Sequence, residues 1–161
     1  MSMAVTPRKS MERYGFTFRL GKGVDGVKFY GKGPHENYCD RATAAKLGLY
    51  EGKAEDFIHD YLYPQENGDH TGVRYAEIGG ENGVKIQYVN APSEMTVHPY
   101  TTMELHNAQH SCELGRDDRL TVNIDGKQRG VGGDTPAMAC TKPHYDILPG
   151  QTHTLRVKLT F

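Results

Sequence analysis

Several features that identify common classes of protein are missing from this sequence. The chain has 161 residues, fewer than the roughly 200 that a (β/α)₈ barrel needs. Its 19 basic and 20 acidic residues give a net charge of −1, without the basic excess of a nucleic-acid-binding protein. No apolar run approaches the roughly 20 residues that cross a bilayer, and no apolar segment near the start resembles a secretory signal. We therefore expect one cytoplasmic domain that binds neither nucleic acid nor membrane.

Cysteine is also scarce. Cys39, Cys112 and Cys140 are odd in number and form no CxxC motif. This is typical of free, buried or half-buried thiols in a cytoplasmic protein. One disulfide with one free thiol is the alternative for a secreted chain.

Alternation of apolar and polar residues with a period of two is the strongest pattern in the chain. It predicts half-buried strands over residues 16–20, 26–31, 73–78, 84–89, 120–125 and 155–161. Asn82-Gly83, between two of these runs, predicts a type I′ hairpin turn because both residues tolerate positive φ. The pattern as a whole predicts a mainly β fold, an antiparallel β-sandwich.

Two short helices are expected in the connections between strands. Asp40 can cap a helix over residues 41–48, in which Gly48 would be left-handed at the C-terminal end. Threonine caps predict a second helix over residues 101–111, with Met103, His106 and His110 near one face.

The segment YGKGPHENYCDR, residues 30–41, contains a Gly-x-Gly motif. It lacks the GKS/T of a P-loop, and Pro34 has no N–H to offer a phosphate. It is more typical of a tight corner after a strand, in which Arg41 pairs with an acid. Four polar side chains are expected to hydrogen-bond the backbone of this turn: His35, Glu36, Asn37 and Asp40.

Two histidines have the i, i+4 spacing of metal ligands on a helix. Asn107, which follows His106, occupies the place where a zincin carries its catalytic glutamate. A metalloprotease is therefore excluded, and His106 and His110 are more typical of exposed helix side chains. A structural metal held by these two histidines and Cys112 is the alternative.

Carboxylates that could serve glycoside hydrolysis are present by type: Glu36, Asp40, Glu66, Glu77 and Asp134. The reaction needs two carboxylates roughly 5 to 9 Å apart, and nothing in the sequence places any two at that separation. The same holds for a His/Glu pair that would epimerise an aldose. The segment GVGGD, residues 130–134, would let backbone approach a partner, with Asp134 accepting hydrogen bonds from sugar hydroxyls. A β-bulge or wide turn is the alternative.

Four segments, in this order, resemble the C-terminal region of family-2 β-galactosidases, which is also called the β-galactosidase small chain. They are YGKGPHENYCDR, YLYPQENGDHTGVRY, LTVNIDGKQRGVGGD and the closing LPGQTHTLRVKLTF. The resemblance runs from about Arg13 to the last residue. We therefore assign residues 13–161 to this domain and residues 1–12 to a flexible or added N-terminal segment.

The resemblance implies an antiparallel supersandwich related to galactose mutarotase, of which this chain is the second half. It also implies that the catalytic glutamates and a magnesium site lie in an upstream (β/α)₈ domain. This chain would then have no catalytic residue, metal or cofactor, and would be inactive alone. The loop after GVGGD would form a wall of the active site for terminal β-galactosides such as lactose, with Asp134, Thr135 and Ala137 as its substrate-binding residues.

Two positions depart from the pattern of the family. Well-known members carry a tryptophan in that loop, on which the sugar stacks. Ala137 stands near its position, and the chain contains no tryptophan. Met138 and Tyr145 are residues of a type that would replace part of the stacking surface of this tryptophan. Cys39 stands where the family usually has proline, which should loosen the corner slightly.

The missing first half of the sandwich would leave strand edges exposed, which favours a homodimer or added strand pairing. The upstream catalytic domain and the galactoside substrate are the partners that the resemblance implies. A free-standing carbohydrate-binding or aldose-epimerase-like protein is the alternative function.

Overall fold

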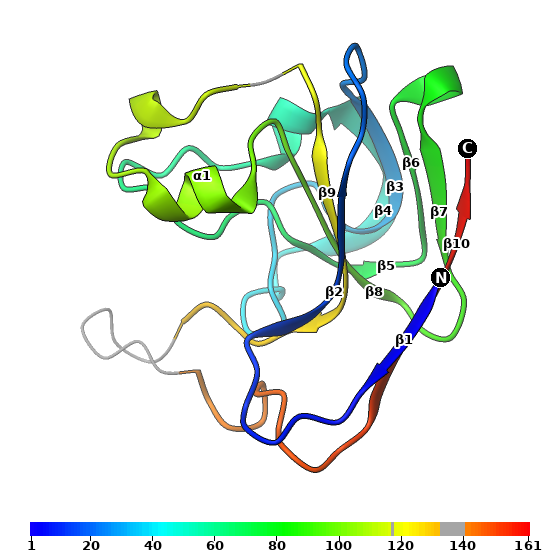
Figure 1. Ribbon diagram of the computed structural model, residues 1–161, viewed down its shortest axis with the longest axis vertical. Coiled ribbons are helices and arrows are strands. Elements are labelled where there is room, and N and C mark those ends of the chain that lie inside the picture. Colours follow the sequence, from blue (N-terminus) through cyan, green and yellow to red (C-terminus); the bar gives the residue numbers. More distant parts are fainter. Residues whose placement is uncertain (117, 133–140) are drawn as a thin grey trace.

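The computed structural model describes residues 1–116, 118–132 and 141–161, whose strands form two antiparallel sheets (Figure 1). One sheet has the order β1 (Ser2–Val5), β10 (His153–Thr160), β7 (Val84–Tyr88), β6 (Tyr75–Ile78), β3 (Gly26–Gly33) and β4 (Lys46–Lys53). The other has the order β2 (Arg13–Arg19), β9 (Thr121–Gln128), β8 (Ser93–His98) and β5 (His70–Val73). The expected mainly β, sandwich-like architecture is confirmed.

The hydrophobic core lies between the two sheets. Phe29 and Ile86 come from the six-stranded sheet, Met95 and Ile124 from the four-stranded sheet, and each is at most 1% exposed. Strand β3 alternates strictly between half-buried and buried residues, as a strand with one face on a core must.

The other face of the four-stranded sheet is polar, yet it is also buried. Thr96 and Asn123 on this face are almost inaccessible to solvent. In Figure 1 this sheet lies between the six-stranded sheet and the segments around helix α1 (Thr102–Asn107). Short 3₁₀ turns within the described connections span Ala54–Phe57, Gly80–Asn82 and Ser111–Glu113. No helix among the described residues is long and apolar enough to span a membrane.

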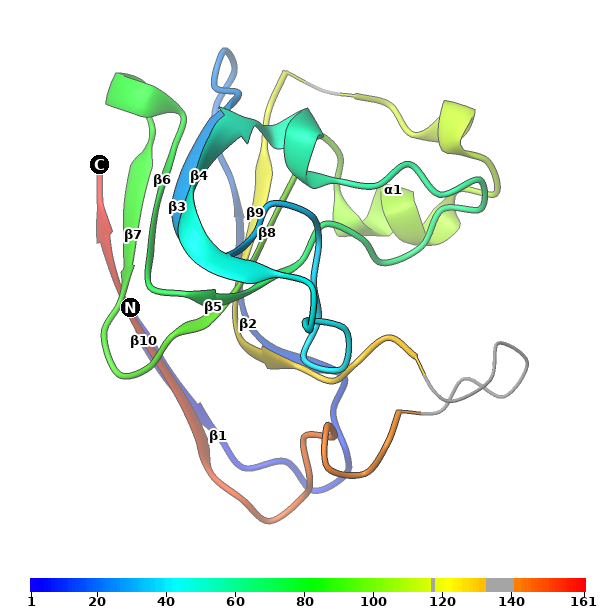
Figure 2. The same cartoon turned by 180° about the vertical axis from the view of Figure 1, so that it is seen from behind.

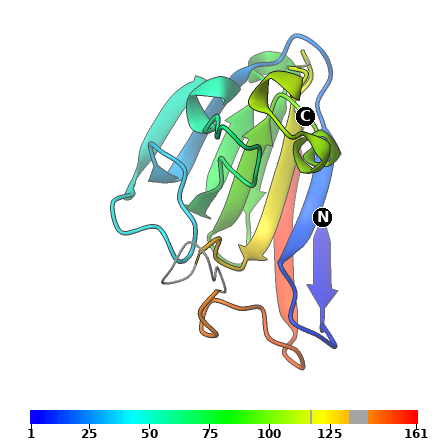
Figure 3. The same cartoon turned by 90° about the vertical axis from the view of Figure 1, so that its left-hand side faces the viewer.

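The helices gather at one end of the sandwich, and the segment 141–150 lies at the other end (Figure 3). The second expected helix is confirmed over its first part. It begins after Thr101, whose side chain accepts a hydrogen bond from the Glu104 N–H, but it ends at Asn107. His110 therefore lies outside the helix, and Met103 is exposed.

The prediction of a helix over residues 41–48 is wrong. Lys46–Lys53 form strand β4, which pairs with β3 along its whole length, from Gly33↔Lys46 to Gly26↔Lys53. Pairing with a neighbouring strand therefore overrides the local helix signal. Asp40 does not cap a helix, and its side chain reaches residues 131 and 132 instead.

Two further expectations about strands need correction. Residues 73–78 are not one strand, because β5 ends at Val73 in the four-stranded sheet and β6 begins at Tyr75 in the other. The hairpin between β6 and β7 is present, but its turn is not type I′. Gly79 and Gly80 have positive φ, at 83° and 63°, whereas Gly83 has a φ of −103°. The five-residue loop puts its left-handed conformations on glycines alone.

The N-terminal segment and the cysteines also differ from expectation. Within residues 1–12, Ser2–Val5 form β1 and pair with β10, from Ser2↔Arg156 to Val5↔His153 (Figure 2). Cys39 is a half-buried free thiol, as expected, but Cys112 is exposed. Cys140 lies outside the described residues.

Candidate functional site

The corner at residues 34–41 is held to the segment 61–71 by side-chain hydrogen bonds. The Glu36 carboxylate accepts a 2.8 Å hydrogen bond from the Gly68 N–H, and its other oxygen accepts from Arg41 and Tyr61. Burial alone would raise the pKa of Glu36, but these donors and the charge of Arg41 outweigh it and lower that pKa. Glu36 is therefore a structural carboxylate, and the predicted pairing of Arg41 with an acid is confirmed.

Asn37 joins the same two segments from the inside. Its Nδ2 donates to the carbonyls of Lys32 (3.0 Å) and His35 (3.1 Å). Its Oδ1 accepts from both the N–H (3.0 Å) and the Oγ1 (2.6 Å) of Thr71. The side chain is fully buried and uses both of its donors and both acceptor positions, so the two motifs form one unit.

A group of three buried carboxylates and one partly exposed one, Glu66, lies next to this unit, on the polar face of the four-stranded sheet. Arg13 pairs with Asp125 and, at 3.3 Å, with Glu66. Glu94 accepts a hydrogen bond from the Gln128 N–H, and Asp69 accepts one from Thr96. Four acids thus surround one guanidinium: Glu66, Asp69, Glu94 and Asp125.

Burial controls the protonation of this group. It raises the pKa of all four carboxyl groups, and that of Glu94 to about 7, with the negative charge of Asp125 adding to the effect. Burial also lowers the pKa of His70 and of His98 to about 4, so both imidazoles are neutral at pH 7. These groups lie under the loop that carries the PQENGDH motif, since His98 Nε2 contacts the Asn67 carbonyl at 2.9 Å.

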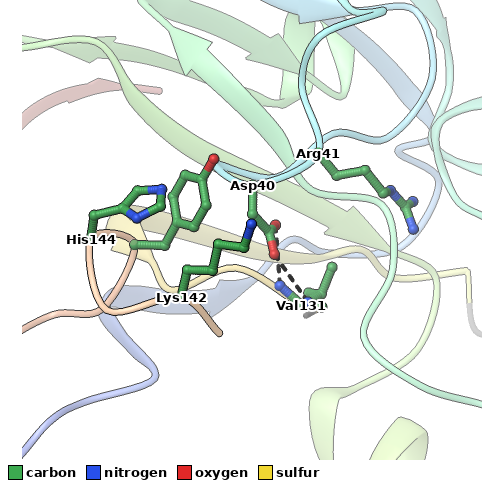
Figure 4. Close-up of a pocket in the computed structure, with 7 residues that line it drawn as sticks. Asp40, Arg41, Val131, Lys142 and His144 are labelled. Atoms are coloured by element: carbon green, nitrogen blue, oxygen red, sulfur yellow. Dashed lines mark hydrogen bonds between the residues drawn. The ribbon is translucent and has the colours of Figure 1, made fainter. Parts of the chain in front are cut away.

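A pocket of about 380 Å³ opens beside the corner (Figure 4). At its floor the Asp40 carboxylate accepts hydrogen bonds from the N–H groups of Val131 (3.2 Å) and Gly132 (3.0 Å). In Figure 4 the Lys142 side chain runs toward Asp40, whereas that of Arg41 points away. The residues that line the pocket are Asp40, Arg41, Val131, Gly132, Lys142, His144 and Tyr145.

The chain on either side of residues 133–140 is fixed at this pocket. Thr141 Oγ1 donates a 3.0 Å hydrogen bond to the Gly130 carbonyl. Gly130 is buried, and a Cβ added there would overlap the Asp40 carboxylate. Glycine is therefore required for this close approach of backbone to side chain. The His144 and Tyr145 rings, 4.0 Å apart between centroids, add an aromatic wall.

The predicted substrate-binding residues Asp134, Thr135 and Ala137 lie outside the described residues, as does Met138. Among the other candidates, Asp40 lines the pocket, and Glu36 and Glu66 lie in the neighbouring networks. Glu77 lies elsewhere, on the six-stranded sheet, where it pairs with Lys85 at 3.3 Å.

The histidines of the 101–111 segment do not form a metal centre with Cys112. His110 Nδ1 lies 2.8 Å from Glu113 Oε1 on the surface. The described part of the chain contains no group of three or more His, Cys, Asp or Glu side chains that could hold a metal ion.

Several residues of this region were not predicted from the sequence. Lys142 and His144 line the pocket, and Arg13 and Glu94 belong to the buried charged group. Glu94 and Arg13 lie in or next to strands, where alternation marks a polar face but does not reveal that another segment covers it. The Lys-Pro-His-Tyr run at residues 142–145 carries no strand or helix pattern that would have placed it.

Comparison with known proteins identifies the family to which this chain is similar. The family model for the β-galactosidase small chain matches residues 1–159. The β-galactosidase of Priestia megaterium is 38% identical over 141 residues, which are 87% of this chain and 14% of that protein. The β-galactosidase of Halalkalibacterium halodurans is 42% identical over 123 residues, which are 75% of this chain and 12% of that protein.

A third relative, β-galactosidase BgaC of Bifidobacterium adolescentis, is 34% identical over 150 residues, or 91% of this chain. The chain spans only 12–14% of the length of these curated relatives, so it corresponds to one region of a much longer polypeptide. With the family model matching nearly the whole chain, this protein belongs to the β-galactosidase small chain family.

Proposed function

We propose that this chain completes the substrate pocket of a β-galactosidase and does not hydrolyse galactosides alone. The observation that carries the proposal is the pocket at Asp40. It brings together the GPHENYCDR corner and both sides of the segment that holds Asp134, Thr135 and Ala137. A wall built in this way would contact a terminal β-galactoside, such as lactose, bound mainly by another part of the enzyme.

The carboxylates near the pocket support an accessory role. Retaining or inverting hydrolysis needs one carboxyl group as acid and a second as nucleophile or base. Both oxygens of Glu36 already accept hydrogen bonds, and its lowered pKa does not suit a general acid. Asp40 is occupied by two backbone N–H groups. The catalytic acids, and any magnesium, would therefore come from the rest of the polypeptide. The proposal also includes that this chain holds no cofactor and that the enzyme is cytoplasmic.

The test is hydrolysis of a chromogenic β-galactoside by this chain alone and after addition of the catalytic portion of the same β-galactosidase. We expect no turnover by the chain alone and turnover in the mixture. Turnover by the chain alone would overturn the proposal. Measurable affinity of the isolated chain for galactose would instead favour a free-standing carbohydrate-binding protein.

Two variants test whether the pocket residues of this chain contribute to substrate binding or activity in the mixture. Asp134→Ala should raise KM in the mixture, because it removes a hydrogen-bond acceptor expected at the sugar. Asp40→Asn should reduce the restored activity several-fold, because each carboxylate oxygen accepts from a different backbone N–H, and the variant turns one of these oxygens into an NH₂ donor that faces an N–H. Asp118→Asn removes an exposed carboxylate that pairs with Lys22 at 3.3 Å, and serves as the matched control. Equal activities for the Asp40 and Asp118 variants would exclude the pocket from function.

A further inference from the structure

Strand β4 forms one edge of the six-stranded sheet (Figure 2). An apolar patch lies on the outer face of the sheet at this edge. Leu47 is 48%, Leu49 54% and Tyr75 40% exposed. In the β-sheet register Tyr30 lies opposite Leu49 on one side and opposite Tyr75 on the other. These four residues, Tyr30, Leu47, Leu49 and Tyr75, form the outer patch.

The outer patch departs from the pattern of the rest of this face. Elsewhere the exposed side chains are polar, and some are charged and paired, as in Lys28–Glu51 (2.9 Å) and Lys85–Glu77 (3.3 Å). An antiparallel sheet with one face in solvent normally continues such a polar surface to its edge. Exposed leucines on an edge strand are instead a liability for aggregation unless another surface covers them.

The composition of the outer patch is that of a protein interface. The Tyr30 and Tyr75 rings are stacked with centroids 5.9 Å apart, and the Arg74 guanidinium lies 5.5 Å from the Tyr30 centroid. Tyrosine and arginine are the residues enriched in the energetic centres of interfaces, and the leucines extend the apolar contact area.

Charge distinguishes between the partners that could cover the outer patch. Lys32 lies opposite Leu47 and Arg74 lies over Tyr30, and neither cation forms an ion pair within the described ranges. A second copy docked through a twofold axis would bring these cations close to their own equivalents, which is unfavourable. A partner with an apolar surface bordered by carboxylates would be complementary.

We infer that the outer patch is the surface on which the remainder of the β-galactosidase polypeptide packs, through an apolar area bordered by acidic residues. The chain spans only 12–14% of its relatives, so most of such a polypeptide lies outside this structure and is available as the partner. The inference rests on the proposed function in one respect, namely that this chain works when bound to the rest of the enzyme.

Binding, measured separately from activity, tests the inference. The chain is immobilised, and its affinity for the catalytic portion of the same β-galactosidase is measured by biolayer interferometry. Leu49→Asp should weaken binding at least tenfold, because it places a carboxylate in the centre of an apolar contact. Thr160→Asp adds the same charge to an exposed position on β10 of the same sheet, and should change the affinity less than twofold. Far-UV circular dichroism establishes that both variants are folded.

Footprinting of the wild-type complex maps the bound surface without any substitution. Hydroxyl-radical labelling should show protection of Leu47, Leu49 and Tyr75 on binding, and no change at Thr160. Equal affinities for the two variants, unprotected leucines, or no complex at all would overturn the inference. A wild-type dimer that Leu49→Asp dissociates would assign the outer patch to self-association and would also overturn it.

The outcomes separate this inference from the proposed function. If the wild-type chain binds through the outer patch but the mixture does not hydrolyse a galactoside, the proposed function fails and the inference stands. If hydrolysis is restored and Leu49→Asp binds like wild type, the inference fails and the proposed function stands.

Discussion

The Glu36 carboxylate accepts a 2.8 Å hydrogen bond from the backbone N–H of Gly68, 32 residues further along the chain. This contact joins the GPHENYCDR and PQENGDH motifs directly. The partners of its side chains therefore decide whether the first motif is a ligand-binding loop or a structural corner. It is a corner in which Glu36 and Asn37 face protein, whereas Asp40 and Arg41, at its end, line a pocket.

Asn37 should be among the most sensitive positions of this corner. Asn37→Ala removes hydrogen bonds to the Lys32 and His35 carbonyls and leaves two buried Thr71 donors without their acceptor, and should lower the free energy of unfolding by about 2–4 kcal/mol. Asn90→Ala is the matched control. Asn90 bonds the Thr154 carbonyl and the Arg156 N–H at an exposed site, where water replaces the lost contacts. Urea unfolding measures both, and similar losses would contradict the role of burial.

A side chain at Gly130 should destabilise the protein. Gly130→Ala would force the Asp40 carboxylate away from the Val131 and Gly132 N–H groups, and should cost roughly 1–3 kcal/mol of stability. Gly21→Ala is the control, because a Cβ at Gly21 meets nothing within 4 Å. Thermal unfolding of the two variants checks this. A Gly130→Ala protein as stable as Gly21→Ala would show that Asp40 and the loop move apart without loss.

Glu94 should make the protein less stable as pH rises. Its pKa is raised to about 7 in the folded state, so between about pH 4.5 and 7 the folded state binds more protons than the unfolded state. The stability that this group contributes is therefore lost across that window. Glu94→Gln should become more stable relative to wild type between pH 5 and pH 8, by on the order of 1–3 kcal/mol.

Urea unfolding at several pH values measures this difference. Glu51→Gln, which changes an exposed carboxylate paired with Lys28, is the control and should show little change with pH. A pH-independent difference between Glu94→Gln and wild type would show that Glu94 is ionised in the folded protein.

His98 should act in the opposite direction at acid pH. Burial lowers its folded pKa to about 4, below the unfolded value of about 6.5, so the unfolded state gains protons first as pH falls. The contribution of His98 to stability should therefore be lost from about pH 6.5 downward. His98→Gln should lose about 1–2 kcal/mol less than wild type between pH 6.5 and 5, although it is less stable at pH 7.5. His110→Gln, at an exposed histidine, should follow wild type. Parallel profiles for all three proteins would contradict the prediction.

Much of the fold follows from local pattern, and particular elements show why. Alternation over residues 26–31 and 84–89 predicted β3 and β7, because each has one face on the core and one in solvent. Alternation could not predict β8, all six of whose residues are buried, because its polar face is covered by another segment. The prediction of a helix over residues 41–48 was wrong because the local sequence resembles a capped helix, whereas the folded chain pairs Lys46–Lys53 with strand β3.

The candidate site shows the same division. The sequence identified the corner, the glycine-rich segment and the resemblance to β-galactosidases, and the family match confirms that resemblance. It did not identify the pairing of Asp40 with residues 131 and 132, which lie more than 90 residues away along the chain.

Taken alone, the sequence determined the β class, most of the strands and the family, because periodicity and motif order are properties of the chain itself. Tertiary structure alone decided which face of each sheet is covered, where Asp40 finds its donors, and that Glu94 is buried among other acids. Those outcomes depend on segments distant in sequence coming into contact, and hydrogen bonding, burial and pKa shifts all arise from that contact.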